Sequence, residues 1–107
     1  MKASIITFSF AAALLSIGTA NAADAAAAQA LAQKNACMTC HAVDKKVVGP
    51  GFKEVSTKYK GDKGAEAKLI KKVKDGGSGV WGNIPMPPNP QVKEEDIKTI
   101  VQWVLSL

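Results

Sequence analysis

The five residues Cys37-Met38-Thr39-Cys40-His41 constrain this chain of 107 residues more than any other feature. Because residues three apart lie on the same face of a helical turn, the two thiols can reach the edge of one flat molecule. The histidine that follows brings an imidazole ligand to the same place. Cys-x-x-Cys-His is the spacing at which a c-type haem is joined to protein. We therefore predict one haem c attached through thioethers to Cys37 and Cys40, with His41 as an axial iron ligand.

Two other chemistries use cysteines at this spacing. A disulfide or a thioredoxin-like redox pair belongs to a βαβ unit, and no strand-like alternation follows the motif in this sequence. A structural zinc site usually needs four ligands, whereas the chain offers two cysteines and one histidine. Haem attachment is the interpretation that the sequence favours over both.

The N-terminus has the form of a secretory signal peptide. Lys2 precedes an apolar stretch at residues 5–17, and Ala20-Asn21-Ala22 has the small-x-small form of a cleavage site. We predict residues 1–22 as a signal peptide and residues 23–107 as one domain that is exported to the periplasm. An uncleaved membrane anchor is the alternative, because the apolar run approaches the ~20 residues that span a bilayer. A domain this small has a limited core, which a large apolar cofactor can complete.

The net charge is basic, yet every basic residue is a lysine: 14 lysines and 9 acidic residues give a formal charge of +5. Lysine is a hydrated point charge, whereas arginine is preferred for bidentate recognition. The lysines therefore suit the steering of an acidic redox partner, and a solvated face that favours solubility is the alternative. Nucleic acid is not expected as a partner, because acidic residues alternate with the lysines and the protein is predicted to be exported.

Four helical segments are predicted. Asp24 can cap an alanine-rich helix that runs to about Ala36. A short second segment starts at Phe52, and residues 65–75 form a third helix whose lysines face mostly outward. The last helix has an apolar stripe at i, i+3, i+4, i+7 and i+8: Ile97, Ile100, Val101, Val104 and Leu105. Between these helices, residues 76–90 contain four glycines and four prolines, which exclude regular structure.

A second axial ligand must come from a residue other than histidine, because His41 is the only one. Met1 leaves with the signal peptide and Met38 lies inside the attachment turn, which leaves Met86. The prolines on both sides of Met86 restrict its backbone. Histidine and methionine together raise the reduction potential of a haem iron. A core-filling methionine and a polyproline recognition segment are the alternatives.

Several motifs in a fixed order resemble one family. They are Cys37 to His41, Val48-Gly49-Pro50, Gly79-Val80-Trp81-Gly82, Ile84-Pro85-Met86-Pro87-Pro88-Asn89 and Trp103-Val104-Leu105. Together they resemble the small monohaem class I cytochromes c of bacteria, the group that donates electrons to periplasmic nitrite reductase. The resemblance implies an all-α fold of about four helices around one haem, with the terminal helices crossing.

The resemblance also implies roles for three further residues. Pro50 is expected to offer its backbone carbonyl to the ring N–H of His41. Trp81 is expected to donate its indole N–H to a haem propionate, and Asn89 to restrain the methionine ligand. An ordinary packed aromatic and a plain turn residue are the alternatives for these two.

Two positions depart from the pattern of the family. Lys72 stands where related proteins often carry a propionate-binding arginine, so a bidentate contact is not expected there. Lys93 stands where a serine or threonine commonly caps the last helix, at a cost of ~1 kcal/mol if nothing replaces it.

The expected function is that of an electron carrier and not an enzyme, with no catalytic residues. Iron would cycle between the ferric and ferrous states, and lysines around the haem edge would guide brief encounters with redox partner proteins. We expect a monomer without stable membrane insertion once the signal peptide is removed. A haem peroxidase or gas sensor with a labile sixth iron ligand is the main alternative, and a subunit of a larger oxidase or reductase is another.

Overall fold

The computed structural model describes residues 19–107, with side chains from residue 24 on. The predicted signal peptide lies outside these residues except for its last four positions, so it stays a prediction. The elements are α1 (Thr19–Lys34), the 3-10 helix η1 (Cys37–Thr39), α2 (Phe52–Lys58), α3 (Ala65–Asp75) and α4 (Glu94–Leu105). The described part of the chain contains no β-strand, so the fold is all-α, as predicted.

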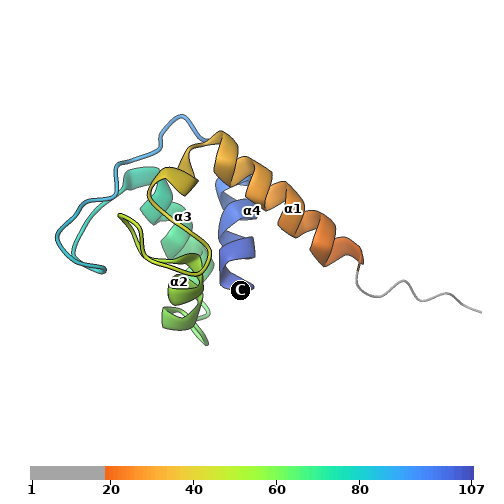
Figure 1. Ribbon diagram of the computed structural model, residues 1–107, viewed down its shortest axis with the longest axis horizontal. Coiled ribbons are helices and arrows are strands. Elements are labelled where there is room, and N and C mark those ends of the chain that lie inside the picture. Colours follow the sequence, from red (N-terminus) through yellow and green to blue (C-terminus); the bar gives the residue numbers. More distant parts are fainter. Residues whose placement is uncertain (1–18) are drawn as a thin grey trace, which may run out of the picture.

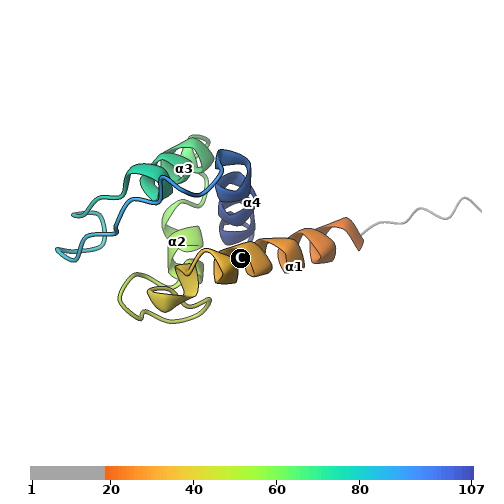
Figure 2. The ribbon, with the colours of Figure 1, turned by 90° about the horizontal axis from the view of Figure 1, so that it is seen from above.

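Helix α4 is the centre of the structure, because α1, α2 and α3 all pack against it. Figure 1 shows α4 between α1 and α3, and Figure 2 shows α1 crossing it. Its apolar stripe faces inward because residues at helical spacing share one face. The buried core includes Ala28, Ala32, Phe52, Val55, Leu69, Val92, Ile97, Ile100, Val101, Trp103 and Val104. None of the helices described here has the length and apolar character needed to cross a membrane.

The prediction that Asp24 caps α1 is wrong. The helix begins at Thr19, so Asp24 lies inside it and is exposed. Alanine has the highest helix propensity, which allows the alanine-rich stretch to continue the helix on the N-terminal side of Asp24. At the other end, the side-chain amide of Asn35 donates to the carbonyl oxygen of Leu31 at 2.9 Å. Ala36 then takes a left-handed conformation, with φ 60°, and turns the chain into η1.

Helix α4 begins without a side-chain cap, as the lysine at its N-cap position predicts. Lys93 makes no capping hydrogen bond. Instead, acidic residues occupy the whole first turn, where they favour the positive end of the helix dipole. One of them, Glu94, forms an exposed ion pair with Lys74 of α3 at 3.4 Å.

The segment from Gly76 to Lys93 contains neither helix nor strand, in agreement with its glycines and prolines. Its two arms are nevertheless joined, because Gly77 and Met86 exchange two backbone hydrogen bonds of 3.0 and 2.8 Å. The backbone N–H of Asn89 also donates to the carbonyl of Val73 at 3.1 Å, which fastens the segment to the end of α3. The segment reaches out beside α3 (Figures 1 and 2) and forms one side of a cavity.

Candidate functional site

An apolar cavity of about 340 Å³ lies between the helices, η1 and the 76–93 segment. Its volume is within the range typical of ligand-binding sites. The residues predicted to bind the cofactor all line it: Cys37, Cys40, His41, Pro50, Trp81, Met86 and Asn89. The helices contribute apolar side chains to its wall: Val55, Leu69, Val73, Ile97, Ile100, Val101 and Val104. The structure therefore brings together predicted cofactor residues that are up to 52 positions apart in the sequence, from Cys37 to Asn89.

The two cysteines lie at one edge of this cavity, on the tight turn of η1. Both thiols are free and partly buried. Backbone N–H groups of Cys40 and His41 donate to the carbonyl of Cys37 at 3.2 and 3.0 Å, which holds the turn closed. Burial raises the pKa of the Cys37 thiol and so disfavours the thiolate that disulfide exchange and zinc binding require. Among residues 19–107, no three or more His, Cys, Asp or Glu side chains are grouped to hold a metal ion.

Pro50 determines which ring nitrogen of His41 carries the hydrogen. Its Nδ1 atom lies 2.8 Å from the Pro50 carbonyl oxygen, the contact that the family resemblance implies. Because a carbonyl can only accept, Nδ1 must carry the proton. In the neutral ring this leaves the lone pair of Nε2 available to a metal ion.

The ring of His41 is also held by packing. Phe52 stacks on it with ring centroids 5.0 Å apart and 22° between the planes. Trp103 in turn contacts Phe52 edge-on at 5.5 Å, which links the imidazole to the core. Gly49 lies against another part of the ring, since a Cβ atom there would be 2.6 Å from Cε1 of His41. Sequence reasoning missed these contacts: it placed Phe52 at the start of a short helical segment but could not show what the ring contacts.

Met86 is positioned through its backbone. Besides its paired hydrogen bonds with Gly77, its carbonyl oxygen lies close to the α-carbon of Gly76. Gly76 has φ 70° and ψ −164°, a conformation that essentially only glycine adopts. The sequence shows these two glycines as helix breakers; nothing local indicates that they pair with a methionine ten residues later.

Three further residues line the site. The side-chain amide of Asn89 donates to the carbonyls of Val73 and Pro87, both at 3.1 Å, so it fixes the chain next to Met86. Lys72 lines the cavity and is thus an exception to the outward-facing lysines predicted for α3. Trp81 lies at the edge of the cavity with 39% of its surface exposed.

The donor set fits a covalently attached haem. One apolar cavity is lined by two free thiols, an imidazole whose Nε2 lone pair is available, and a methionine on a separate segment. These are the groups through which c-type haem proteins attach the haem and bind its iron. The fold and the site together define an all-α monohaem protein.

Comparisons with known proteins agree with this class. Residues 25–107 match the cytochrome c family. The chain is 46% identical over 95 residues to cytochrome c-551 of Pseudomonas aeruginosa, which covers 87% of this chain and 90% of that protein. It is 57% identical over 70 residues to cytochrome c-551 of Azotobacter vinelandii, covering 65% and 84% of the two chains. The crystal structure of Nitrosomonas europaea cytochrome c552 is 48% identical, has a TM-score of 0.72 and covers 74% of this chain and 98% of its own.

The chain therefore belongs to the cytochrome c family, as a small class I member with one covalently attached c-type haem. Proteins of this family transfer electrons through that haem and interact with redox partner proteins.

Proposed function

We propose that this protein carries single electrons in the periplasm, with its haem attached through Cys37 and Cys40 and its iron held by His41 and Met86. One observation carries the proposal. The Nδ1 atom of His41 is engaged by Pro50, while Met86 lines the same cavity from a separate segment. The chain thus offers one nitrogen and one sulfur ligand to a single site.

When bound, the haem supplies the one-electron exchange between ferric and ferrous iron. The residues of the chain set the conditions for this exchange. His41 offers its Nε2 lone pair, and the Pro50 carbonyl and the Phe52 ring keep that atom directed into the cavity. The apolar wall keeps water away from the site, and a thioether ligand raises the reduction potential.

The arrangement of the Met86 segment favours a carrier over a peroxidase or gas sensor. Those functions need an iron position that is open or easily vacated. Met86 is held instead by two backbone hydrogen bonds to Gly77, and Asn89 fastens the following turn to α3. A ligand held in this way is suited to stay bound in both oxidation states.

The mouth of the cavity is suited to brief contact with an acidic partner. Lys46 and Lys72 are among the residues that line the cavity, and so are three exposed apolar side chains: Val48, Val80 and Ile84. An apolar centre with a positive border favours fast, small-area encounters. Nitrite reductase as the acceptor follows from the family resemblance alone. The periplasmic location is supported by the predicted signal peptide as well as by that resemblance.

Absorption spectra of both oxidation states and the pyridine test for thioether-linked haem test the proposal. Met86→Ala should abolish the absorption band of sulfur bound to ferric iron and lower the reduction potential. Met38→Ala is the matched control: this methionine lies in the attachment turn and should leave the band unchanged. A band that persists in Met86→Ala would remove Met86 as the ligand, and a purified protein without haem would refute the whole proposal.

A further inference from the structure

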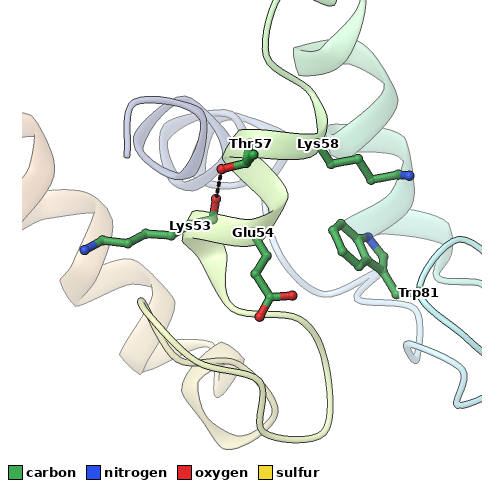
Figure 3. A pocket seen from close by; sticks show the side chains of 5 residues that line it. All are labelled: Lys53, Glu54, Thr57, Lys58 and Trp81. Carbon is green, nitrogen blue, oxygen red and sulfur yellow. Dashed lines mark hydrogen bonds between the residues drawn. The ribbon is translucent and has the colours of Figure 1, made fainter.

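Trp81 forms part of a wall between two hollows. It lines the haem cavity, and it also lines an open hollow of about 440 Å³ on the outer side, next to α2. The other residues of the outer hollow all come from α2: Lys53, Glu54, Thr57 and Lys58 (Figure 3). The position of this one indole therefore decides how well the cavity is closed toward α2.

The loop that carries Trp81 does not fix the indole by itself. Gly79 and Gly82 both have positive φ, 102° and 112°, and a hydrogen bond of 2.8 Å from the N–H of Gly79 to the carbonyl of Gly82 closes the turn around Trp81. Among the described residues, no hydrogen bond or ion pair joins residues 78–84 to any other element. Residues 78–84, the tip of the 76–93 segment, must therefore be held against the rest of the protein by side-chain contacts.

Lys58 supplies such a contact. Its ammonium nitrogen lies 5.4 Å from the centroid of the Trp81 ring, within the ~6 Å of a cation–π interaction. Glu54 lies one helical turn earlier on α2, where an i, i+4 ion pair with Lys58 would be the usual choice. In the described part of the chain that ion pair is not formed; the ammonium lies over the indole instead, as Figure 3 shows.

We propose that Lys58 is a positioning residue for Trp81: through the cation–π contact it holds the indole in the wall of the haem cavity and restricts the access of water from the α2 side. The proposal rests on the proposed function and on the expectation, from the family resemblance, that Trp81 donates its indole N–H to a haem propionate. Lys58 then acts on the haem in two ways. Its positive charge favours ferrous iron, as any nearby lysine does, and its contact with the ring keeps the indole N–H in place, which no other lysine of the hollow does.

The matched control is Lys53, which belongs to the same helix and the same hollow. Figure 3 shows its side chain pointing away from Trp81. Lys53→Gln and Lys58→Gln remove one positive charge each from exposed positions of α2, so both variants should fold normally. Lys58→Arg keeps the charge and can still contact the ring.

The experiment measures solvent exchange of the two indole N–H groups by NMR in the ferrous holoprotein, with Trp81→Phe used to assign the signals. The buried indole of Trp103 serves as the internal reference. Lys58→Gln should speed exchange at Trp81 by about two- to fivefold, the factor that corresponds to an exposed cation–π contact. Lys53→Gln and Lys58→Arg should exchange at the rate of the unmodified protein, and the potential should fall further in Lys58→Gln than in Lys53→Gln.

Equal exchange at Trp81 in the two glutamine variants would overturn the proposal, and so would an arginine variant that exchanges as fast as Lys58→Gln. The proposed function is tested separately by the absorption spectrum of the same samples after oxidation to the ferric state. Absence of the sulfur-to-iron band in the oxidised, unmodified protein would refute His/Met ligation, while the exchange comparison would still decide whether Lys58 positions Trp81.

Discussion

The two sides of the haem cavity hold their proposed iron ligands by different means. On the His41 side, a side-chain ring is stacked on Phe52 and is linked through it to the core. On the Met86 side, the contacts that position the residue are made by the backbone, with Gly76 and Gly77 as partners. The first side should therefore be sensitive to the loss of packing, and the second to a loss of backbone freedom.

The largest effect is expected for Phe52→Ala on the His41 side. Truncating a buried aromatic ring leaves a cavity, and we expect the free energy of unfolding of the holoprotein to fall by about 3–5 kcal/mol, measured in denaturant. Phe52→Leu fills most of the space without stacking on the imidazole, so it serves as the control and should lose less. A loss below about 1 kcal/mol in Phe52→Ala would show that the core does not support His41.

The next effect is expected for Gly76→Ala on the Met86 side. The conformation of Gly76 disfavours any side chain, and a Cβ atom would meet the carbonyl oxygen of Met86 and lie 2.8 Å from the nitrogen of Pro88. We expect a loss of about 3 kcal/mol in the free energy of unfolding and a weaker sulfur-to-iron band.

Gly49→Ala is the counterpart on the His41 side and the control for this prediction. The three atoms nearest to its new Cβ would all belong to the side chain of His41, and its φ lies outside the positive range that side chains avoid. We expect a loss of about 1–3 kcal/mol and an unchanged sulfur band. If Gly49→Ala weakened the band more than Gly76→Ala, the difference between the two sides would not exist.

A smaller effect is expected for Asn89→Ala, which removes two side-chain hydrogen bonds next to Met86. We expect stability to fall by about 1 kcal/mol and the potential to decrease, as judged by denaturant unfolding and redox titration. Asn35→Ala is a matched control, because its amide makes a similar bond to Leu31 on the attachment side of the cavity. Equal changes of potential in both variants would contradict a specific role of Asn89 at Met86.

The smallest effect is expected for Asp62→Asn, away from both sides. Its carboxylate accepts hydrogen bonds of 2.8 Å from Lys68 and from the N–H of Gly64, and the bond from Lys68 lowers the pKa of Asp62 below its ordinary value of 3.8. A lowered folded-state pKa stabilises above the unfolded pKa, and this contribution disappears as the pH falls through the folded value. Asp62→Asn should thus reduce stability slightly at neutral pH and not at all in strong acid, with no change of potential. Asp44→Asn, at an exposed site, is the control for loss of charge.

The sequence predicted those features that depend on local patterns. The range of α3, the apolar stripe of α4 and the irregular 76–90 segment follow from periodicity and from glycine and proline. The predicted start of α1 was wrong, because the high helix propensity of alanine continues the helix on the N-terminal side of Asp24. Contacts between distant elements could not be predicted from the sequence. Spacing alone favours an ion pair of Lys58 with Glu54, whereas in the fold the ammonium of Lys58 lies over the ring of Trp81.

Ser56 influences the order in which parts of this protein unfold. Its buried hydroxyl faces the carbonyl oxygens of Leu105 and Leu107, 49 and 51 positions along the chain, at 3.2 and 2.8 Å. This contact joins α2 to the end of α4, and the segment that carries Met86 lies between these two elements in the sequence. Gentle warming should then release that segment in a subglobal opening while the helices melt later as one cooperative body.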